Sequence, residues 1–214
     1  RVFNVGALGV ENTIKTKLIK KNELFKIYKI PYNRKLALVT FHPSTKNNKE
    51  YANQINELLY SFSKVKDFFY IFTSSNADPY GKYFIEKINN FVEKNNNSKI
   101  FKSMGYKVYL SFMKYVDLVI GNSSSGIIEA PALKTQTLNI GNRQEGREFS
   151  KSITSCDCQS NKIINILNKI LYNKNRIIYQ NIYYKKNTSK NIFFGIKNIF
   201  KKNYTLKKFY DVKY

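Results

Sequence analysis

The sequence predicts an α/β fold in which a parallel sheet is covered by helices on both faces. Short continuous apolar runs, rich in β-branched and aromatic side chains, alternate with longer amphipathic stretches. Such runs are typical of strands buried on both faces, and the stretches between them are long enough for the helical crossovers that parallel strands require. Polar, glycine-containing loops follow the strands, at the edge of the sheet where ligands bind in folds of this class.

Each expected element is assigned from its periodicity. A buried strand is a short apolar run, as in KLALVTF, whereas a helix has apolar side chains three or four positions apart, as Ile55, Leu58 and Phe62 are. Strands are expected at 35–41, 68–73, near 98–103, at 117–121 and at 137–141. Helices are expected at 49–66, 81–95, 106–115, 127–133, 161–171 and 193–200.

The alternating pattern fills residues 36–172, which form the expected domain. Residues 1–35 hold one short apolar stretch followed by many lysines, too little for a domain, and residues 173–214 are strongly basic. Because the chain begins with Arg1 and not with Met, we expect it to be a piece of a longer protein. No apolar run approaches the roughly 20 residues of a membrane span, and no signal-peptide pattern is present, so we expect a cytoplasmic protein without a membrane partner.

The net charge of +23, from 37 Lys and Arg against 14 Asp and Glu, raises the question of nucleic-acid binding. The basic residues are mostly lysines scattered among Asn, Ile and Tyr, a composition that an AT-rich coding bias supplies. Arginine, the residue for bidentate contacts with bases, is sparse, and no zinc-finger, RNP or KH pattern appears. We therefore expect no specific nucleic-acid partner.

Cys156 and Cys158 form a lone C-x-C sequence. A four-ligand zinc site needs further partners, and His42, the only histidine, is more than a hundred positions away. We expect no metal site, and two reduced thiols.

The stretch GNSSSG, 121–126, lies between an expected strand and an expected helix. Such a turn presents free backbone N–H groups and the positive end of the helix dipole. Ser123, Ser124 and Ser125 add hydroxyl donors, and Gly126 lets the backbone come close to a ligand. This composition suits a phosphate or a diphosphate. The alternative, that the serines merely cap the helix, stays open from spacing alone.

Charged residues near this loop extend the candidate site. Glu129 is expected on the first turn of the helix, where it suits sugar hydroxyls better than phosphate. Arg143 and Arg147, in GNRQEGR, follow the next strand and have planar groups that suit phosphate. An exposed loop with incidental charges is the alternative. The P-loop pattern is absent, which argues against an ATPase.

Two further loops contribute candidates. His42 ends the strand at 35–41, where a general acid or a donor to developing charge is one interpretation and a satisfied core histidine the other. Asn76 and Asp78 lie in SNADPYG, where they either form an Asx-turn or line the same cleft.

The segments VTFHPST, FTSSNADPYG and VIGNSSSGIIEAPALKTQTLNIGNRQEGR, in this order, resemble the hydrolysing UDP-N-acetylglucosamine 2-epimerases of the sialic-acid pathway. The opening RVFNVGALGVENT resembles the stretch in which that family's first domain leads into its second. The similarity covers about residues 1–172 and, more loosely, NTSKNIFFGIKNIF. It implies two Rossmann-like domains in a glycosyltransferase-B-like fold, with the nucleotide sugar between them and this chain as the second domain.

The resemblance also implies an organisation and a set of roles. Residues 1–35 would be the end of the first domain and the linker, 36–172 the nucleotide-sugar-binding domain, and 173–214 a C-terminal helix and basic tail. The helix would cross back to the first domain, so that without that domain its apolar face around Phe193, Phe194 and Ile196 is exposed. The implied site is Ser123 and Ser124 with Ser125 and Gly126 at the diphosphate, Glu129 at the ribose, Arg143 at the phosphates or nucleotide pocket, Asn76 near the uridine, and His42 assisting departure of UDP.

The family's reaction eliminates UDP across C1–C2 of the sugar and adds water to the glycal-like intermediate, giving N-acetylmannosamine without a cofactor. Its acid–base carboxylates come from the first domain, so we expect this chain alone to be inactive and to need that missing N-terminal domain as a partner. The full-length protein is expected to be a homo-oligomer. Two alternatives stay open: a sister enzyme acting on UDP- or GDP-linked 2,4-diacetamido sugars of legionaminic-acid synthesis, and a non-catalytic nucleotide-sugar-binding fragment.

Overall fold

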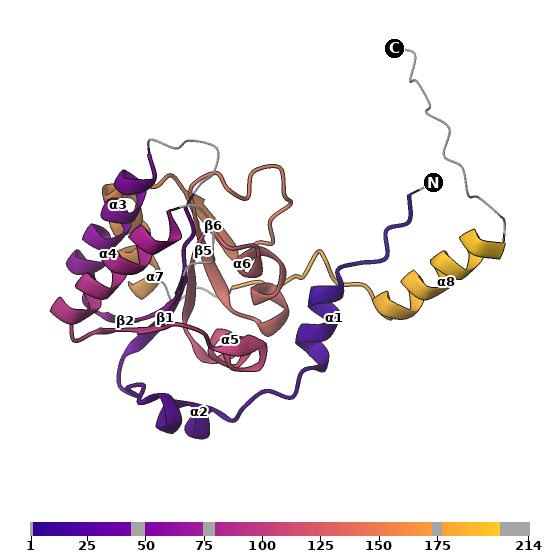
Figure 1. Ribbon diagram of the computed structural model, residues 1–214, viewed down its shortest axis with the longest axis horizontal. Helices are drawn as coiled ribbons and strands as arrows, with labels where there is room; N and C mark the ends of the chain where they lie inside the picture. The colour runs from indigo at the N-terminus through magenta and orange to yellow at the C-terminus, as the bar shows by residue number, and fades with distance from the viewer. Residues whose placement is uncertain (1, 44–49, 75–79, 173–176, 202–214) are drawn as a thin grey trace, which may run out of the picture.

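The computed structural model describes residues 2–43, 50–74, 80–172 and 177–201 (Figure 1). At its centre is a parallel six-stranded sheet in the order β3-β2-β1-β4-β5-β6. The strands are β1 Lys35–Thr40, β2 Phe68–Thr73, β3 Ser98–Phe101, β4 Leu118–Gly121, β5 Gln136–Ile140 and β6 Ile153–Cys156. The strand order reverses between β1 and β4, which makes their carboxyl ends the topological switch point of the sheet. The predicted fold class is confirmed.

Helices cover both faces of the sheet (Figure 1). One face is covered by α3 Tyr51–Lys64, α4 Gly81–Lys94 and α7 Ser160–Tyr172. The other is covered by α2 Lys21–Tyr28, α5 Gly105–Tyr115 and the 3-10 turn η1 Ala130–Leu133. Within the described part of the chain, no helix is long and apolar enough to span a membrane.

The continuous apolar runs arise because the strands are buried on both sides. Successive side chains of β1 point to opposite faces, so Ala37 and Val39 enter the core with α3, α4 and α7, whereas Leu36 and Leu38 enter the core with α2 and α5. All four are at most 3% exposed, and β2 alternates in the same way. β1 and β2 therefore each contribute to two cores at once.

The five strands predicted from apolar runs are confirmed, with ends shifted by up to two residues, and β6 was missed. β6 has only four residues and lies at the edge of the sheet with half-buried and exposed side chains, so it gives no apolar run. α2 was also not predicted, because lysines surround its two core residues, Leu24 and Phe25. Both are at most 1% exposed, and they anchor the segment before β1 to the second core.

The helix expected at 127–133 is instead two short pieces. α6 extends over Ser124–Ile128, three residues earlier than predicted, and η1 follows it. Pro131 explains the break, because it has no N–H to donate to the carbonyl of Ile127 and cannot continue the α-helical ladder. The two pieces meet at Glu129, which is therefore at the end of α6 and not on its first turn.

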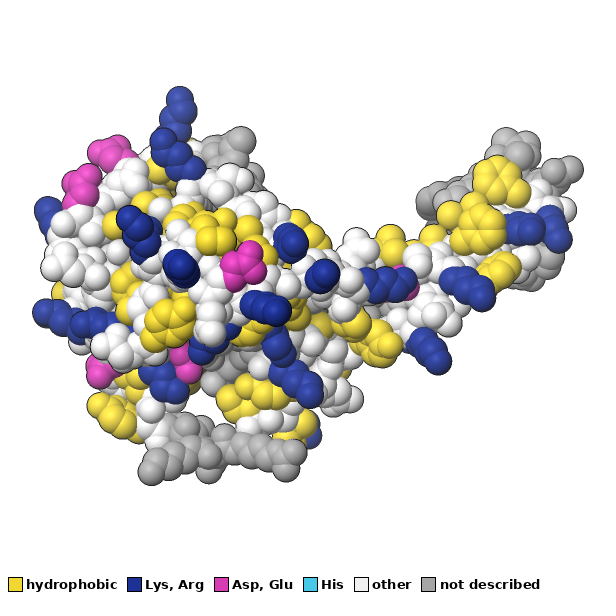
Figure 2. Space-filling view, turned by 90° about the horizontal axis from the view of Figure 1, so that it is seen from below, with side chains coloured by type: hydrophobic (Ala, Val, Ile, Leu, Met, Phe, Trp, Pro, Cys, Tyr) yellow, Lys and Arg dark blue, Asp and Glu magenta, His cyan; other side chains and the backbone are white. Residues whose placement is uncertain are grey.

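The helices α1 Leu8–Lys15 and α8 Thr188–Lys201 are held together beside the sheet (Figure 1). The Glu11 carboxylate accepts a hydrogen bond of 2.7 Å from the backbone N–H of Ser189, in the first turn of α8, and forms an ion pair with Lys15. Phe193 and Phe194, which lie on α8, are 60% and 46% exposed. α8 projects away from the sheet, and Figure 2 shows apolar side chains on it. Lysine and arginine side chains are spread widely over the visible face.

Gly121, the last residue of β4, lets two strands approach closely at the switch point. Its φ is +138°, and a Cβ at this position would lie 1.9 Å from the carbonyl oxygen of Thr40 in β1. Contact at that distance is impossible between non-bonded atoms, so only glycine fits without separating the strand ends.

We predict that Gly121→Ala lowers the free energy of unfolding by more than about 3 kcal/mol, because the added methyl forces β1 and β4 apart. Gly141→Ala is the matched control: its φ is +78° with nothing within 4 Å of an added Cβ, so it costs only the left-handed strain of about 1–2 kcal/mol. Urea unfolding followed by circular dichroism measures both. Equal losses in the two variants would show that the close approach to Thr40 has no energetic weight.

Candidate functional site

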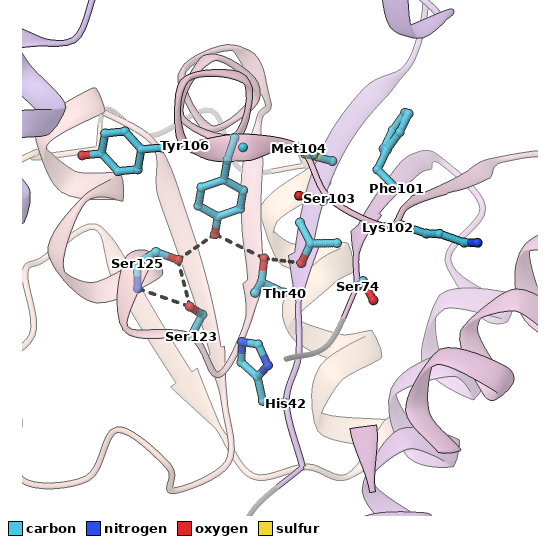
Figure 3. Close-up of a pocket in the computed structure, with 13 residues that line it drawn as sticks. Thr40, His42, Ser74, Phe101, Lys102, Ser103, Met104, Tyr106, Ser123 and Ser125 are labelled. Carbon is cyan, nitrogen blue, oxygen red and sulfur yellow. Dashed lines mark hydrogen bonds between the residues drawn. The ribbon is translucent and has the colours of Figure 1, made fainter. Parts of the chain in front are cut away.

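A pocket of about 500 Å³ opens at the carboxyl ends of the strands, beside the switch point (Figure 3). Hydroxyl groups from four elements line one part of it, and the loop between β3 and α5 lines another. Its lining residues are Thr40, His42, Thr73, Ser74, Phe101, Lys102, Ser103, Met104, Gly105, Tyr106, Tyr109, Ser123 and Ser125. The predicted residues His42, Ser123 and Ser125 therefore lie in one pocket, as strand-end loops of a parallel sheet should.

The three serines of the loop have different surroundings. Ser123 is the N-cap of α6, and its Oγ accepts hydrogen bonds from the backbone N–H of Ser125, at 3.4 Å, and from the Ser125 hydroxyl, at 3.0 Å. Both side chains also line the pocket, so capping and ligand contact are compatible here. Ser124 is half-buried on the first turn and does not line the pocket.

Gly126 is buried and faces the sheet. A Cβ at Gly126 would lie 2.9 Å from Cγ2 of Thr137, and the Gly126 carbonyl accepts a hydrogen bond of 2.8 Å from the Thr137 hydroxyl. The close contact of Gly126 is therefore with β5. This contact packs α6 directly against the sheet and so positions the serine loop relative to the strand ends.

His42 is buried at the floor of the pocket, and its backbone is held by Asn122. The His42 N–H donates to Oδ1 of Asn122, and Nδ2 of Asn122 donates to the His42 carbonyl, both at 2.8 Å. Figure 3 shows the imidazole pointing from the end of β1 into the pocket. The two loops that carry His42 and Ser123 are thus joined by one buried side chain.

Arg143 lies in a small neighbouring hollow and does not line the main pocket. Its Nη1 donates a hydrogen bond of 3.1 Å to the Asn122 carbonyl, which also accepts one of 2.8 Å from Gln144. The guanidinium is exposed and keeps further donors for an anion. The structure thus brings Arg143 next to the serine loop through Asn122.

Glu129 is half-buried where α6 meets η1, close to α1. A Cβ added at Gly9 of α1 would lie 2.8 Å from Oε1 of Glu129. Oε2 of Glu129 is buried with no hydrogen-bond partner among the described residues. Burial raises the pKa of this carboxyl, while its own backbone N–H and the charge of Arg147 act in the opposite direction. An unpartnered carboxylate oxygen in this setting can accept hydrogen bonds from ligand hydroxyls.

Two of the predicted candidates, Asn76 and Asp78, lie outside the residues that the structure describes. Cys156 and Cys158 are free thiols, as predicted, and burial raises their pKa values to about 11 and about 12. Within the described ranges, no group of three His, Cys, Asp or Glu side chains is placed to hold a metal ion.

Sequence reasoning missed Asn122 and Tyr109. Asn122 follows Gly121 directly in the loop that was singled out, but an asparagine there gives no indication that it pairs with the backbone of another loop. Tyr109 lies on α5, and its hydroxyl contacts Ser125 at 2.6 Å and Thr40 at 3.2 Å. Only the three-dimensional arrangement brings it to the site.

The strand order, the switch point and the loops gathered there define a Rossmann-like domain that is one half of a glycosyltransferase-B-like fold. The chain belongs to the UDP-N-acetylglucosamine 2-epimerase family, whose sequence pattern matches residues 1–197. The family expected from the sequence motifs is thereby confirmed.

Two curated relatives and one solved structure show the extent of the similarity. The Campylobacter jejuni GDP/UDP-N,N'-diacetylbacillosamine 2-epimerase (hydrolyzing) is 39% identical over 154 residues, which cover 72% of this chain and 40% of that protein. The Escherichia coli polysialic acid biosynthesis protein P7 is 37% identical over 216 residues, covering 99% and 55%. The Methanocaldococcus jannaschii UDP-GlcNAc 2-epimerase in complex with UDP-GlcNAc and UDP has a TM-score of 0.69 and 19% identity, covering 92% and 54%. The chain spans about half the length of the relatives it matches.

We predict that Glu129→Gln raises the melting temperature at pH 7–8, by about 2–4 °C for each kcal/mol that ionising the buried carboxyl costs the folded protein. The raised pKa means that the folded protein binds more protons than the unfolded chain between the unfolded and folded pKa values of Glu129. The wild-type protein therefore loses stability as the pH rises through that window, whereas the amide does not.

The measurement is thermal unfolding of both proteins from pH 4 to pH 8, with Glu93→Gln, on the exposed surface of α4, as the control. The advantage of Glu129→Gln should shrink toward pH 4, where the wild-type carboxyl is protonated. A variant that is less stable than wild type at pH 8 would contradict the argument from burial.

Proposed function

We propose that this chain is the nucleotide-sugar-binding half of a hydrolysing 2-epimerase, which converts UDP-N-acetylglucosamine to N-acetylmannosamine and UDP. The observation that carries the proposal is the meeting of His42, Ser123 and Ser125 in one pocket at the switch point of the sheet. Membership of the epimerase family supports the reaction class. A pocket of about 500 Å³ is within the range of small-ligand sites.

The arrangement of donors and acceptors fits UDP. The hydroxyls of Ser123 and Ser125 suit the diphosphate, and Glu129 is one helical turn beyond Ser125, whose carbonyl accepts from the Glu129 N–H at 3.0 Å. Glu129 is not among the residues that line the pocket, and we propose that its carboxylate meets the ribose hydroxyls from this neighbouring turn. The loop that lines the pocket between Phe101 and Tyr106 is then available to the uracil.

In the proposed reaction, the C2 proton of the sugar passes to a base while the C1–O bond breaks, and both electrons of that bond leave with UDP. Water then adds at C1 of the glycal and a proton returns to C2 from the opposite face. The roles of this chain are to hold UDP and to stabilise the charge that develops on its diphosphate, through Ser123, Ser125 and His42, with Arg143 beside them.

The groups that move the C2 proton are proposed to come from the other half of the protein. Among the described residues, none of those lining the pocket is Asp or Glu. In this proposal, residues 1–35 end the first domain and link it to the second, 36–172 bind the nucleotide sugar, and α8 returns to the first domain with its exposed residues Phe193 and Phe194. As a separate part of the proposal, the whole protein is a homo-oligomer of two-domain subunits.

A second candidate substrate is UDP- or GDP-linked N,N'-diacetylbacillosamine. The observation that favours it is the 39% identity with the Campylobacter jejuni protein, which is named for that substrate. The two candidates share the nucleotide, the elimination and the hydration, and differ in the groups on the sugar.

We predict that isothermal titration shows UDP binding to residues 1–214 with a dissociation constant in the micromolar to millimolar range. Ser123→Ala and Arg143→Ala should each weaken binding by about tenfold, because each removes one hydrogen bond to a charged ligand. Ser63→Ala, half-buried near the end of α3, and Arg34→Ala, exposed just before β1, are both away from the strand-end loops and should bind as wild type does. A folded chain without UDP affinity would refute the proposed nucleotide site.

We also predict that residues 1–214 alone show no turnover, and that fusing them to the first half of the Escherichia coli protein P7 produces it. Release of UDP from UDP-N-acetylglucosamine and from UDP-N,N'-diacetylbacillosamine, with products identified by NMR, measures the activity and chooses the substrate. Turnover by residues 1–214 without the added half would show that the acid–base groups lie within this chain.

A further inference from the structure

A continuous chain of hydroxyl groups crosses the floor of the pocket and ends at the serine loop (Figure 3). The oxygen–oxygen distances are 3.0 Å from Thr73 to Thr40, 3.2 Å from Thr40 to Tyr109, 2.6 Å from Tyr109 to Ser125 and 3.0 Å from Ser125 to Ser123. The groups come from β2, β1, α5, α6 and the N-cap of α6. Tyr109 is the link between the strands and the serine loop.

One direction of the protons satisfies every link of this chain. The Ser125 hydroxyl donates to Ser123, and because a hydroxyl has a single proton, Ser125 must accept from Tyr109. Tyr109 then has no proton left for Thr40 and must accept from it. Thr40 in turn can accept from Thr73, whose hydroxyl lies 3.0 Å from the Thr40 oxygen and 3.3 Å from the Val39 carbonyl, its other acceptor. All the protons therefore point toward Ser123.

The end of the chain is a donor that faces the pocket. The Ser123 oxygen accepts from the hydroxyl and from the backbone N–H of Ser125, so its own proton must be donated elsewhere. Among the described residues, no acceptor is positioned to take it, and the side chain lines the pocket. An anionic oxygen in the pocket would complete the chain.

Burying the hydroxyl of Tyr109 costs desolvation free energy that its hydrogen bonds must offset. Burial raises the pKa of its phenol, against the effect of the hydrogen bonds to Ser125 and Thr40, so the hydroxyl stays protonated and remains a donor. A phenylalanine would fill the same space without desolvating a polar group. The hydroxyl therefore has a role in orienting its partners.

We propose that Tyr109 is a positioning residue for the diphosphate of the nucleotide. Its hydroxyl, supplied by Thr40 and Thr73, holds Ser125 and Ser123 in the orientation in which Ser123 donates to the leaving diphosphate. This inference rests on the proposed function, since it assigns the anion that Ser123 meets. It predicts that the Tyr109 hydroxyl contributes to the affinity for the phosphates of UDP and not to the affinity for the nucleoside.

The test is isothermal titration of residues 1–214 with UDP and, separately, with uridine. Tyr109→Phe should weaken UDP binding by about tenfold and leave uridine binding within twofold of wild type, because only the diphosphate needs the oriented donor. Tyr115→Phe, on the same helix, and Tyr70→Phe, which loses a buried hydrogen bond of 2.7 Å to Val65, should leave both affinities unchanged. Equal weakening for UDP and uridine, or unchanged UDP affinity, would overturn the proposal.

A second variant keeps the test decisive if Tyr109→Phe does not fold. Thr40→Val should weaken UDP binding by about threefold. Tyr109 then loses the hydrogen-bond donor that makes its own hydroxyl proton point toward Ser125. Where Tyr109→Phe does fold, adding Thr40→Val to it should have no further effect, whereas a direct contact between Thr40 and the ligand would make the two effects additive. Unchanged UDP affinity in Thr40→Val, or additivity, overturns the proposal. Wild-type protein that binds no UDP refutes the proposed function itself, which separates that failure from the failure of Tyr109.

Discussion

The site depends first on the side chain and the carbonyl of Asn122. The side chain pairs with both backbone groups of His42, and the carbonyl accepts from Arg143 and Gln144. One residue therefore fixes the loops that follow β1, β4 and β5. The side-chain pairing is buried, so breaking either of its bonds leaves an unpaired polar group and costs about 1–3 kcal/mol. The position of His42 relative to Ser123 is set by this pairing together with the close approach of Gly121 to Thr40.

The same region contains polar atoms that the fold leaves unsatisfied. The oxygens Oε2 of Glu129, Oδ1 of Asn139 and Oε1 of Gln144 are buried without hydrogen-bond partners among the described residues. Asn139 belongs to β5 and Gln144 to the loop after it. Buried polar atoms are usually paired, so these three oxygens are acceptors that a bound polar group can satisfy. Sites that must receive a polar ligand commonly have this property.

The sequence predicts the framework because the framework depends on local patterns. β1 and β2 are continuous apolar runs buried on two sides, and the serine loop contains the residues that a strand-to-helix turn requires. The contacts that complete the site are not local. Asn122 acts on the backbone of a residue 80 positions away, and Tyr109 reaches Thr40 across 69 positions. Glu129 was placed wrongly on its helix because the start of α6 depends on capping by Ser123, and its end on Pro131.

The joining of α1 to α8 has a consequence for the order of folding. The bond from Ser189 to Glu11 connects residues 178 positions apart, and Lys185 donates to the carbonyl of Asn4 across 181 positions. At about 5–20 residues per second, a ribosome takes about 10–35 s to make the chain between Glu11 and Ser189. During that time the Glu11 carboxylate has no Ser189 N–H to bind. The sheet between them can form from nearer contacts, so α1, although it is synthesised before the sheet, reaches its final surroundings after the sheet has formed.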